Sequence, residues 1–226
     1  MKLTESPSLP LWVKIAYTAF TATVVREYWL TYTPWNFLFF CDIALLVTCL
    51  AIWIESALLV SMQAVAILLP QMVWVIDLLC RVLLGFHVTG ITAYMLDPHL
   101  PRLLRALSLF HGWLPFFLLW LLVRLGYDRR ALPIQSVVGV LVLVVSYTLA
   151  PAPPHPPDHP QWAVNINYVY GFNDQQPQTL LPNREWVLML MAAMLLLVYA
   201  PTHLVLKRLF GLDRGLEALA PGRQVR

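Results

Sequence analysis

The sequence predicts an all-α protein, a polytopic transmembrane helix bundle with about six spans. Its 226 residues are 59% hydrophobic and only 12% charged, whereas about a quarter of the residues of a typical soluble domain are charged. The mean hydropathy is +0.67. A soluble fold of this length cannot bury so much apolar surface. The composition therefore excludes soluble, fibrous and disordered proteins. It predicts one bundle over residues 1–208 and a short cytoplasmic tail at 209–226.

The first three spans follow from the thickness of the bilayer, because a hydrocarbon core of about 30 Å needs roughly 20 apolar residues. The first predicted span, residues 9–25, is the weakest because it is short and contains Lys14. The second covers residues 35–54. The third, residues 57–84, is long enough to tilt, and Pro70 is expected to kink it.

The second half of the chain supplies three more spans. The fourth covers residues 103–125. The fifth, residues 134–150, ends where a run of prolines begins, and the sixth covers residues 186–206. A loop of residues 151–185 joins the last two spans. A connection of that length is expected to have a function or to cap the bundle.

Basic residues predict the orientation, because Lys and Arg in short loops favour the cytoplasmic side. No Lys or Arg occurs between residues 131 and 183, so the long loop is expected outside the cell. Six spans then place both termini in the cytoplasm. Arg81, Arg102 and Arg105 fall on the outer side and weigh against this orientation. The basic residues that support it follow the fourth span and the sixth: Arg124, Arg129, Arg130, Lys207, Arg208, Arg214, Arg223 and Arg226.

Ionisable side chains within spans are candidate functional positions, because they are costly in hydrocarbon. We placed such residues, together with the cysteines, by depth at about 1.5 Å of helix rise per residue. A polar cluster then falls in the outer half of the bilayer, and we expect it to line a cavity open to the outer leaflet. Its members are Cys41, Asp42, Asp77, Cys80, Arg81, Arg105 and His111.

Spacing suggests how some of these residues interact. Asp77 and Arg81 are four residues apart with the acid first, which predicts an ion pair that fixes helix register. Asp42 and His111 have no partner on their own helices, so a functional role and a packing role are equally open for them. An Asp within reach of a His can orient it as a general base or stabilise its cation.

The predicted outer loop contains two further polar features. Asn165, Asn167 and Tyr168 form a compact patch in NINYVYG, which is expected to cap the bundle or to contact a lipid headgroup. The HPPDH segment has two His and one Asp among prolines, which is a poor zinc signature. Neither a metal nor a cofactor is therefore expected. The basic residues are dispersed, which gives no footprint for nucleic-acid binding.

Several segments resemble known membrane proteins. The strings YTPWNFLFFCDIALL, SLFHGWLPFFLLWLLVRLGYDRRAL and NINYVYG are similar to a group of bacterial proteins described only as membrane-associated. The likeness runs from Trp12 to Arg208 and implies a multi-pass protein of the bacterial cytoplasmic membrane. More distantly, NINYVYGFNDQQPQTLLP resembles the Asn-x-Asn-Tyr loop of the YwaF-type integral membrane proteins.

The WNFLFFCD and HGWLP segments resemble two blocks of the androgen-induced-gene family. Members of that family are membrane hydrolases of fatty-acid esters, with a Thr nucleophile and a His base. The resemblance implies that His111 is the base. The Thr position is occupied by Phe39, which cannot act as a nucleophile. A related group of transmembrane acyltransferases uses Cys with His, and Cys41 or Cys80 has the matching depth.

Three functions are therefore open from the sequence. The first is a lipid enzyme, an acyl-ester hydrolase or acyl transferase, with His111 as base and Asp42 as its orienter. Its nucleophile would be Cys41 or Cys80, and membrane lipid its partner. The second is a non-enzymatic membrane protein that binds or assembles a partner through residues 165–171, with the identity of any protein partner open. The third is a small-solute carrier.

Overall fold

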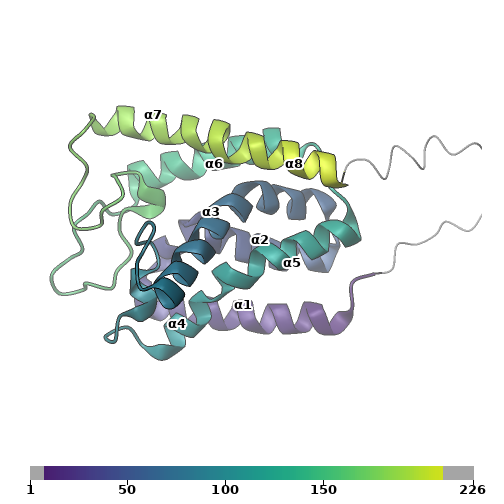
Figure 1. Cartoon of the computed structure of the whole chain (residues 1–226), viewed down its shortest axis with the longest axis horizontal. Helices are drawn as coiled ribbons and strands as arrows, with labels where there is room; N and C mark the ends of the chain where they lie inside the picture. The colour runs from purple at the N-terminus through teal and green to yellow at the C-terminus, as the bar shows by residue number, and fades with distance from the viewer. Residues whose placement is uncertain (1–7, 211–226) are drawn as a thin grey trace, which may run out of the picture.

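The computed structural model describes residues 8–210, and every regular element among them is helical (Figure 1). Short 3₁₀ turns connect some of the helices: η1 (Pro34–Leu38), η2 (Ala93–Leu96) and η3 (Ile166–Tyr168). A π-helical stretch, η4 (Met194–Tyr199), joins the last two helices. The α-helices are α1 (Leu11–Tyr32), α2 (Phe40–Ile54), α3 (Ala57–Leu84), α4 (Arg102–Ser108), α5 (Phe110–Leu125), α6 (Ala131–Leu149), α7 (Asn183–Ala193) and α8 (Ala200–Phe210).

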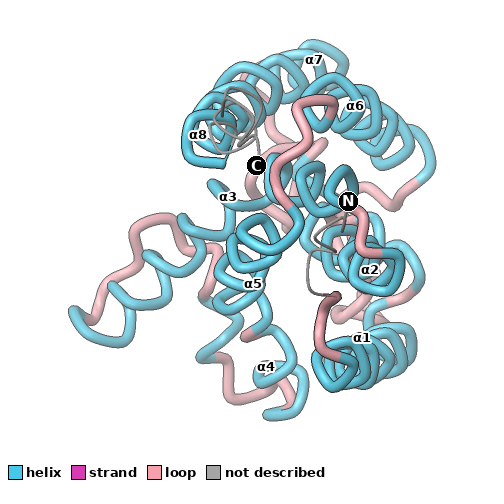
Figure 2. The backbone as a smooth tube through the Cα atoms, turned by 90° about the vertical axis from the view of Figure 1, so that its right-hand side faces the viewer, coloured by secondary structure: helices cyan, strands magenta, loops and turns pink. Residues whose placement is uncertain are grey.

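The helices lie side by side along the long axis, so the molecule has two distinct ends (Figure 1). One end, which we call the loop end, contains the connections of residues 85–101 and 150–182. The central helix is α3, which packs on α2, α5, α6 and α8. Helix α1 lies at the edge of the bundle against α2 (Figure 2). The opposite end, which we call the basic end, contains Arg124, Arg129, Arg130, Lys207 and Arg208.

Four helical stretches are long and apolar enough to cross a membrane: α3, α4 with α5, α6, and α7 through α8. Many large apolar side chains are exposed on their outer faces, as is typical of helices that face lipid. The predicted all-helical membrane bundle is confirmed at this level. Helix α2 has 15 residues, fewer than the roughly 20 that cross a hydrocarbon core. Helix α1 is long enough but does not reach the same apolarity.

The first predicted span, residues 9–25, ends too early. Helix α1 continues to Tyr32 because Val24 and Tyr28 extend its buried face at helical spacing. The charged Arg26 between them is exposed and does not interrupt the helix. The additional turns of α1 bring two tyrosines to the loop end, where the polar side chains gather.

The other predicted spans agree with the structure to different degrees. Residues 57–84 coincide with α3, which continues as a helix through its internal proline. The predicted span 103–125 is interrupted at Leu109, where α4 ends and α5 begins. The last span was predicted at residues 186–206, and the helical stretch extends further at both ends. The predicted tail, 209–226, lies almost entirely outside the described residues.

Helix α6 and the π-helical η4 approach each other closely at Gly139. A Cβ atom at this position would lie 2.6 Å from the Tyr199 hydroxyl oxygen and 2.9 Å from the tyrosine ring. Tyr199 is buried, so its ring has little space into which it could move. Glycine is therefore required for the last helical stretch to pack against α6 in this register.

Candidate functional site

Asp77 is the most fully hydrogen-bonded polar group of the loop end. It is completely buried on α3. Its carboxylate accepts hydrogen bonds from the backbone N–H groups of Thr89, Gly90 and Thr92, at 2.6, 3.0 and 3.1 Å. The Thr92 hydroxyl also donates to Oδ2, and His87 Nδ1 lies 3.1 Å from the same oxygen. The connection after α3 therefore folds back over the helix and closes around one carboxylate.

The predicted ion pair between Asp77 and Arg81 is wrong. Arg81 donates instead to the backbone carbonyl of Gly85 at 2.5 Å, where α3 ends. Arg105 donates to the carbonyl of Met95 at 3.3 Å. The helical spacing rule considers only one helix, whereas here the following loop supplies backbone donors to the carboxylate. Both arginines consequently stabilise the connections of the loop end.

Asp42 is also buried, but only one of its two carboxylate oxygens accepts a hydrogen bond from the described residues. Asn36 Nδ2 donates to Oδ2 at 2.8 Å, whereas Oδ1 has no hydrogen-bond partner among the described residues. Asp42 lies in the first turn of α2, where the helix dipole favours an anion. The hydroxyl groups of Tyr28 and Tyr32 lie close enough to interact with it electrostatically.

A network of hydroxyl groups lies next to Asp42 and connects α1, α3 and α4. The Tyr28 hydroxyl lies 2.9 Å from Ser108 Oγ. Trp74 Nε1 donates to the Tyr94 hydroxyl at 3.2 Å, and the Tyr94 hydroxyl also interacts with the Ser108 side chain. Burial raises the pKa of the Tyr94 phenol well above its usual value of 10. Because this phenol stays protonated at neutral pH, it can act as a hydrogen-bond donor that ties the loop to the helices.

His111, the predicted base, contacts the same network through the protein backbone. Its Nδ1 lies 2.7 Å from the carbonyl oxygen of Ser108. The imidazole ring stacks on Trp74 and on Phe110, with centroid separations of 5.2 and 4.1 Å. Among residues 8–210, no carboxylate or thiol lies within hydrogen-bond distance of the ring. The contacts therefore fix His111 at the junction of α4 and α5.

The cysteines are free thiols and are partly buried. Cys41 lies beside Asp42 and close to Tyr94. In the described part of the chain, neither Cys41 nor Cys80 forms a hydrogen bond with His111. The structure thus brings Cys41, Asp42 and His111 to the same hydroxyl network, but it does not form the predicted nucleophile–base pair.

The patch at Asn165, Asn167 and Tyr168 caps the bundle. Asn167 donates to the carbonyl of Leu38 at 2.8 Å, and its Oδ1 accepts from the N–H of Phe40 at 3.0 Å. It therefore bridges η1 and the first turn of α2. Asn165 uses its amide for the backbone of its own loop. Both asparagines have positive φ angles, which Asn tolerates better than most residues.

The HPPDH segment makes contacts within the long loop. His155 Nδ1 lies 2.8 Å from the carbonyl oxygen of Trp162, and the His159 ring stacks on the indole of Trp162 at 4.0 Å. Within residues 8–210, no three His, Cys, Asp or Glu side chains are grouped closely enough to hold a metal ion. Through these contacts with Trp162, the two histidines stabilise the conformation of the loop.

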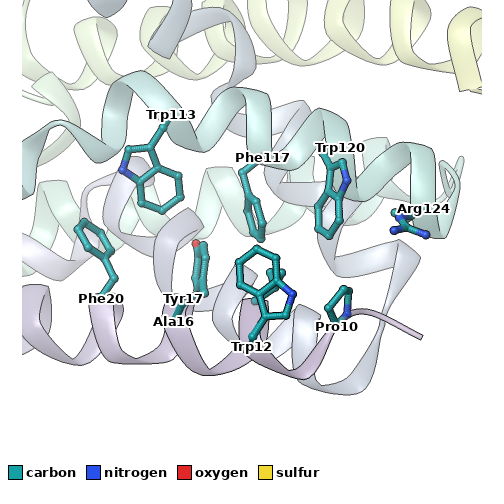
Figure 3. A pocket seen from close by; sticks show the side chains of 10 residues that line it. Pro10, Trp12, Ala16, Tyr17, Phe20, Trp113, Phe117, Trp120 and Arg124 are labelled. Carbon is teal, nitrogen blue, oxygen red and sulfur yellow. The ribbon is translucent and has the colours of Figure 1, made fainter. Parts of the chain in front are cut away.

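An open groove of about 610 Å³ lies between α1 and α5, in the half of the bundle nearer the basic end (Figure 3). Its volume falls in the range of small-molecule sites, roughly 300–1,000 Å³. Side chains of α1 form one wall and aromatic rings of α5 face them from the other (Figure 3). The lining residues are Pro10, Trp12, Val13, Ala16, Tyr17, Phe20, Trp113, Phe117, Trp120 and Arg124.

The two ends of the groove differ in chemistry. Near the middle of α1 and in the first turn of α5, the rings of Phe20 and Trp113 meet edge to face with centroids 5.2 Å apart. At the basic end, the guanidinium carbon of Arg124 lies 5.5 Å from the centroid of the Trp120 ring. From Trp113 to Arg124, α5 rises about 16 Å. The groove thus extends over about half of a 30 Å hydrocarbon core. The Arg124 cation lies where the groove reaches the basic end.

The groove has only a partial signal in the sequence. The α5 wall has a visible signal, because Trp113, Phe117, Trp120 and Arg124 recur at helical spacing. Such a stripe is also what a buried helix face looks like. The tertiary arrangement shows that Tyr17 of α1 packs on Trp113 and Phe117, with ring centroids 5.8 and 5.1 Å apart, and that a groove stays open alongside these rings.

Comparisons of the chain with protein-family models, with curated proteins and with solved structures found no match. The family resemblances drawn from the sequence therefore stay predictions.

Proposed function

We propose that this protein crosses the membrane six times and binds a membrane lipid in the groove between α1 and α5. The observation on which the proposal rests is the groove itself. It is lined almost entirely by apolar and aromatic side chains, and it lies on the outer surface of a bundle whose helices are long and apolar enough to cross a membrane. Water binds such an apolar space poorly. An acyl chain in the groove shields the lining rings from water, which is favourable.

The six crossings and their orientation are part of this proposal. Helices α1 and α2 lie beside the four longer stretches rather than across them (Figure 2). The short loop after α5 contains Arg129 and Arg130, whereas residues 131–183 contain no Lys or Arg. The basic end then faces the cytoplasm and the loop end faces outward. We assign the protein to the bacterial cytoplasmic membrane on the resemblance noted from its sequence.

Lipid binding can be tested with a substitution that fills the groove. Ala16 is exposed on the α1 wall, and Ala16→Phe places a ring in the space between the helices. The matched control is Ala22→Phe, an exposed alanine of the same helix that does not line the groove. Each protein is purified in detergent, and the phospholipid retained per mole of protein is measured by mass spectrometry.

We expect Ala16→Phe to retain at least about fivefold less phospholipid than Ala22→Phe, a difference of about 1 kcal/mol in binding free energy. Equal retention by the two variants, with both folded, would show that the groove does not hold lipid. Circular dichroism and thermal unfolding serve as the test that both variants are folded.

A second candidate function is lipid acyl chemistry at the loop end. The observation in its favour is that Cys41, Asp42 and His111 all border one hydroxyl network. The observation against it is that His111 Nδ1 faces a backbone carbonyl instead of a thiol or carboxylate. A change in cellular lipid species in His111→Ala cells, with the protein still folded and inserted, would favour this function. Unchanged lipid species would remove it.

A further inference from the structure

We infer that the groove is selective for an anionic phospholipid of the leaflet at the basic end, whose phosphate is bound by Arg124. The inference rests on the proposed function, because it names the class of lipid that the same groove would take. Its support comes from the charge, the depth and the lateral opening of the groove.

Arg124 is the single charged residue among those that line the groove. Its side chain is exposed and is held over the indole of Trp120 by a cation–π contact. In the described part of the chain, no carboxylate lies within ion-pair distance of it. Its neighbours differ: Lys14 binds Glu55 at 2.7 Å, and Arg130 binds Asp128. The Arg124 guanidinium is thus positioned and has N–H groups left for an anion.

The depth of Arg124 matches that of a lipid phosphate. It lies in the last turn of α5, about 16 Å along the helix from the closed end of the groove at Trp113. One leaflet of hydrocarbon is about 15 Å thick. An acyl chain that fills the groove to Trp113 therefore leaves its headgroup beside the guanidinium. Trp12 and Trp120 lie at this level, where indole rings favour the interface.

The charge of the lining selects for a net negative headgroup. A zwitterionic lipid has an ammonium group that the Arg124 cation repels, and none of the residues that line the groove has a carboxylate to offset that repulsion. An anionic phospholipid has a phosphate without a compensating amine. The planar guanidinium can bind that phosphate through two hydrogen bonds. Arg129 lies nearby in sequence and adds positive potential at this end without lining the groove.

The groove is open along the side that faces the bilayer, because Trp12 and Ala16 on its α1 wall are exposed (Figure 3). A diacyl lipid can therefore insert one chain between α1 and α5 while its second chain remains in the surrounding bilayer. This opening is the reason to assign a phospholipid and not a free fatty acid, which would use only the enclosed part.

The test uses the full chain in bilayers of defined composition, equal parts of phosphatidylglycerol and phosphatidylcholine with matched acyl chains. After extraction into mild detergent, mass spectrometry gives the ratio of the two lipids retained. The variants are Arg124→Gln and, as a matched control with the same loss of charge at the same end, Arg129→Gln. Arg124→Lys tests whether charge alone is sufficient.

We expect the wild-type protein and Arg129→Gln to retain phosphatidylglycerol in preference to phosphatidylcholine. Arg124→Gln should lower that preference about fivefold, as expected for one cation at a membrane surface. Arg124→Lys should restore part of it, because Lys keeps the charge but not the two-pronged geometry.

Three results would overturn the inference. If Arg124→Gln and Arg129→Gln change the lipid ratio equally, the preference results from the total positive charge at this end, and Arg124 has no specific role. If oleate displaces phosphatidylglycerol at equimolar concentration, and Arg124→Gln abolishes this displacement, the ligand is a fatty acid. If Ala16→Phe retains as much lipid as Ala22→Phe, the proposed function fails together with this inference. A loss of preference with normal total retention would leave that function intact.

Discussion

The loop end and the groove use polar and aromatic residues in opposite ways. At the loop end, the carboxylate of Asp77 and the amides of Asn165 and Asn167 are used in bonds between segments of the same chain. In the groove, aromatic rings face an open space, and Arg124 has no carboxylate partner within residues 8–210. Where polar groups satisfy one another, little capacity remains for a ligand. In this protein, the region richest in polar residues is therefore not the region with the most groups available to a ligand.

The same contrast exists within the loop end, between its two buried carboxylates. Asp77 accepts donors from the loop that follows its helix, whereas Asp42 accepts one hydrogen bond and has an oxygen without a partner. We therefore expect Asp77 to contribute to stability and Asp42 to contribute little. Four predictions test this ranking and the contrast between the two ends.

The largest effect is expected from Asp77→Asn. The amide replaces one acceptor oxygen by a donor and removes the charge, so several loop N–H groups lose their partner. We expect a loss of about 3 kcal/mol or more in unfolding free energy, measured by denaturation in detergent micelles. Proteolysis within residues 85–101 should become faster. Asp97→Asn, an exposed carboxylate in the same loop, is the control. An equal loss in both variants would contradict the role of Asp77.

Asn167→Ala should have the next largest effect. The substitution removes the bridge to the carbonyl of Leu38 and to the N–H of Phe40. We expect a loss of about 2 kcal/mol in unfolding free energy, because buried backbone groups are left unpaired. Thermal unfolding of the purified protein measures it. Asn173→Ala, on an exposed part of the same loop, should change stability much less, and a similar loss there would refute the capping role.

Asp42→Asn is expected to have only a small effect on stability. Only the hydrogen bond from Asn36 is disturbed, and replacing a partly satisfied buried carboxylate by a neutral amide removes a desolvation cost. We expect a change of no more than about 1 kcal/mol in unfolding free energy. A loss as large as that of Asp77→Asn, in the same denaturation assay, would remove the distinction between the two carboxylates.

The smallest effect concerns pH at the basic end. The hydrogen bond from Lys14 lowers the pKa of Glu55 below its ordinary value of 4.5. The pair therefore stabilises the folded state fully above pH 4.5, and this contribution is lost as the pH falls through the lowered pKa. We expect about 0.5 kcal/mol for this pair. Glu55→Gln should abolish that part of the pH dependence in unfolding curves, and an unchanged pH profile would contradict it.

The helical class and the position of α3 could be predicted from the sequence because they depend on hydropathy over long windows. The end of α1 could not, because Arg26 lowers the local hydropathy although its side chain is exposed beside a buried face. The break at Leu109 was also missed. It interrupts a continuous apolar run, and hydropathy does not distinguish one long helix from two short ones.

The candidate sites were harder to predict, for a different reason. Depth alone placed Cys41, Asp42 and His111 at one level of the bundle, and the structure does bring them to one hydroxyl network. Depth could not give the partners of Asp77, because these are backbone groups of a loop whose conformation has no simple sequence signal. The groove depends on the separation of two helices, which no single segment encodes.

The hydrogen bonds between the loop and Asp77 bear on the order of events during synthesis of the chain. A carboxylate within a span costs about 2.5–3.5 kcal/mol at the centre of the bilayer when it has no partner. The donors of Thr92 follow their acceptor by 15 residues, so they leave the ribosome soon after it. The bonds that satisfy Asp77 can therefore form only once the segment that follows α3 has been made.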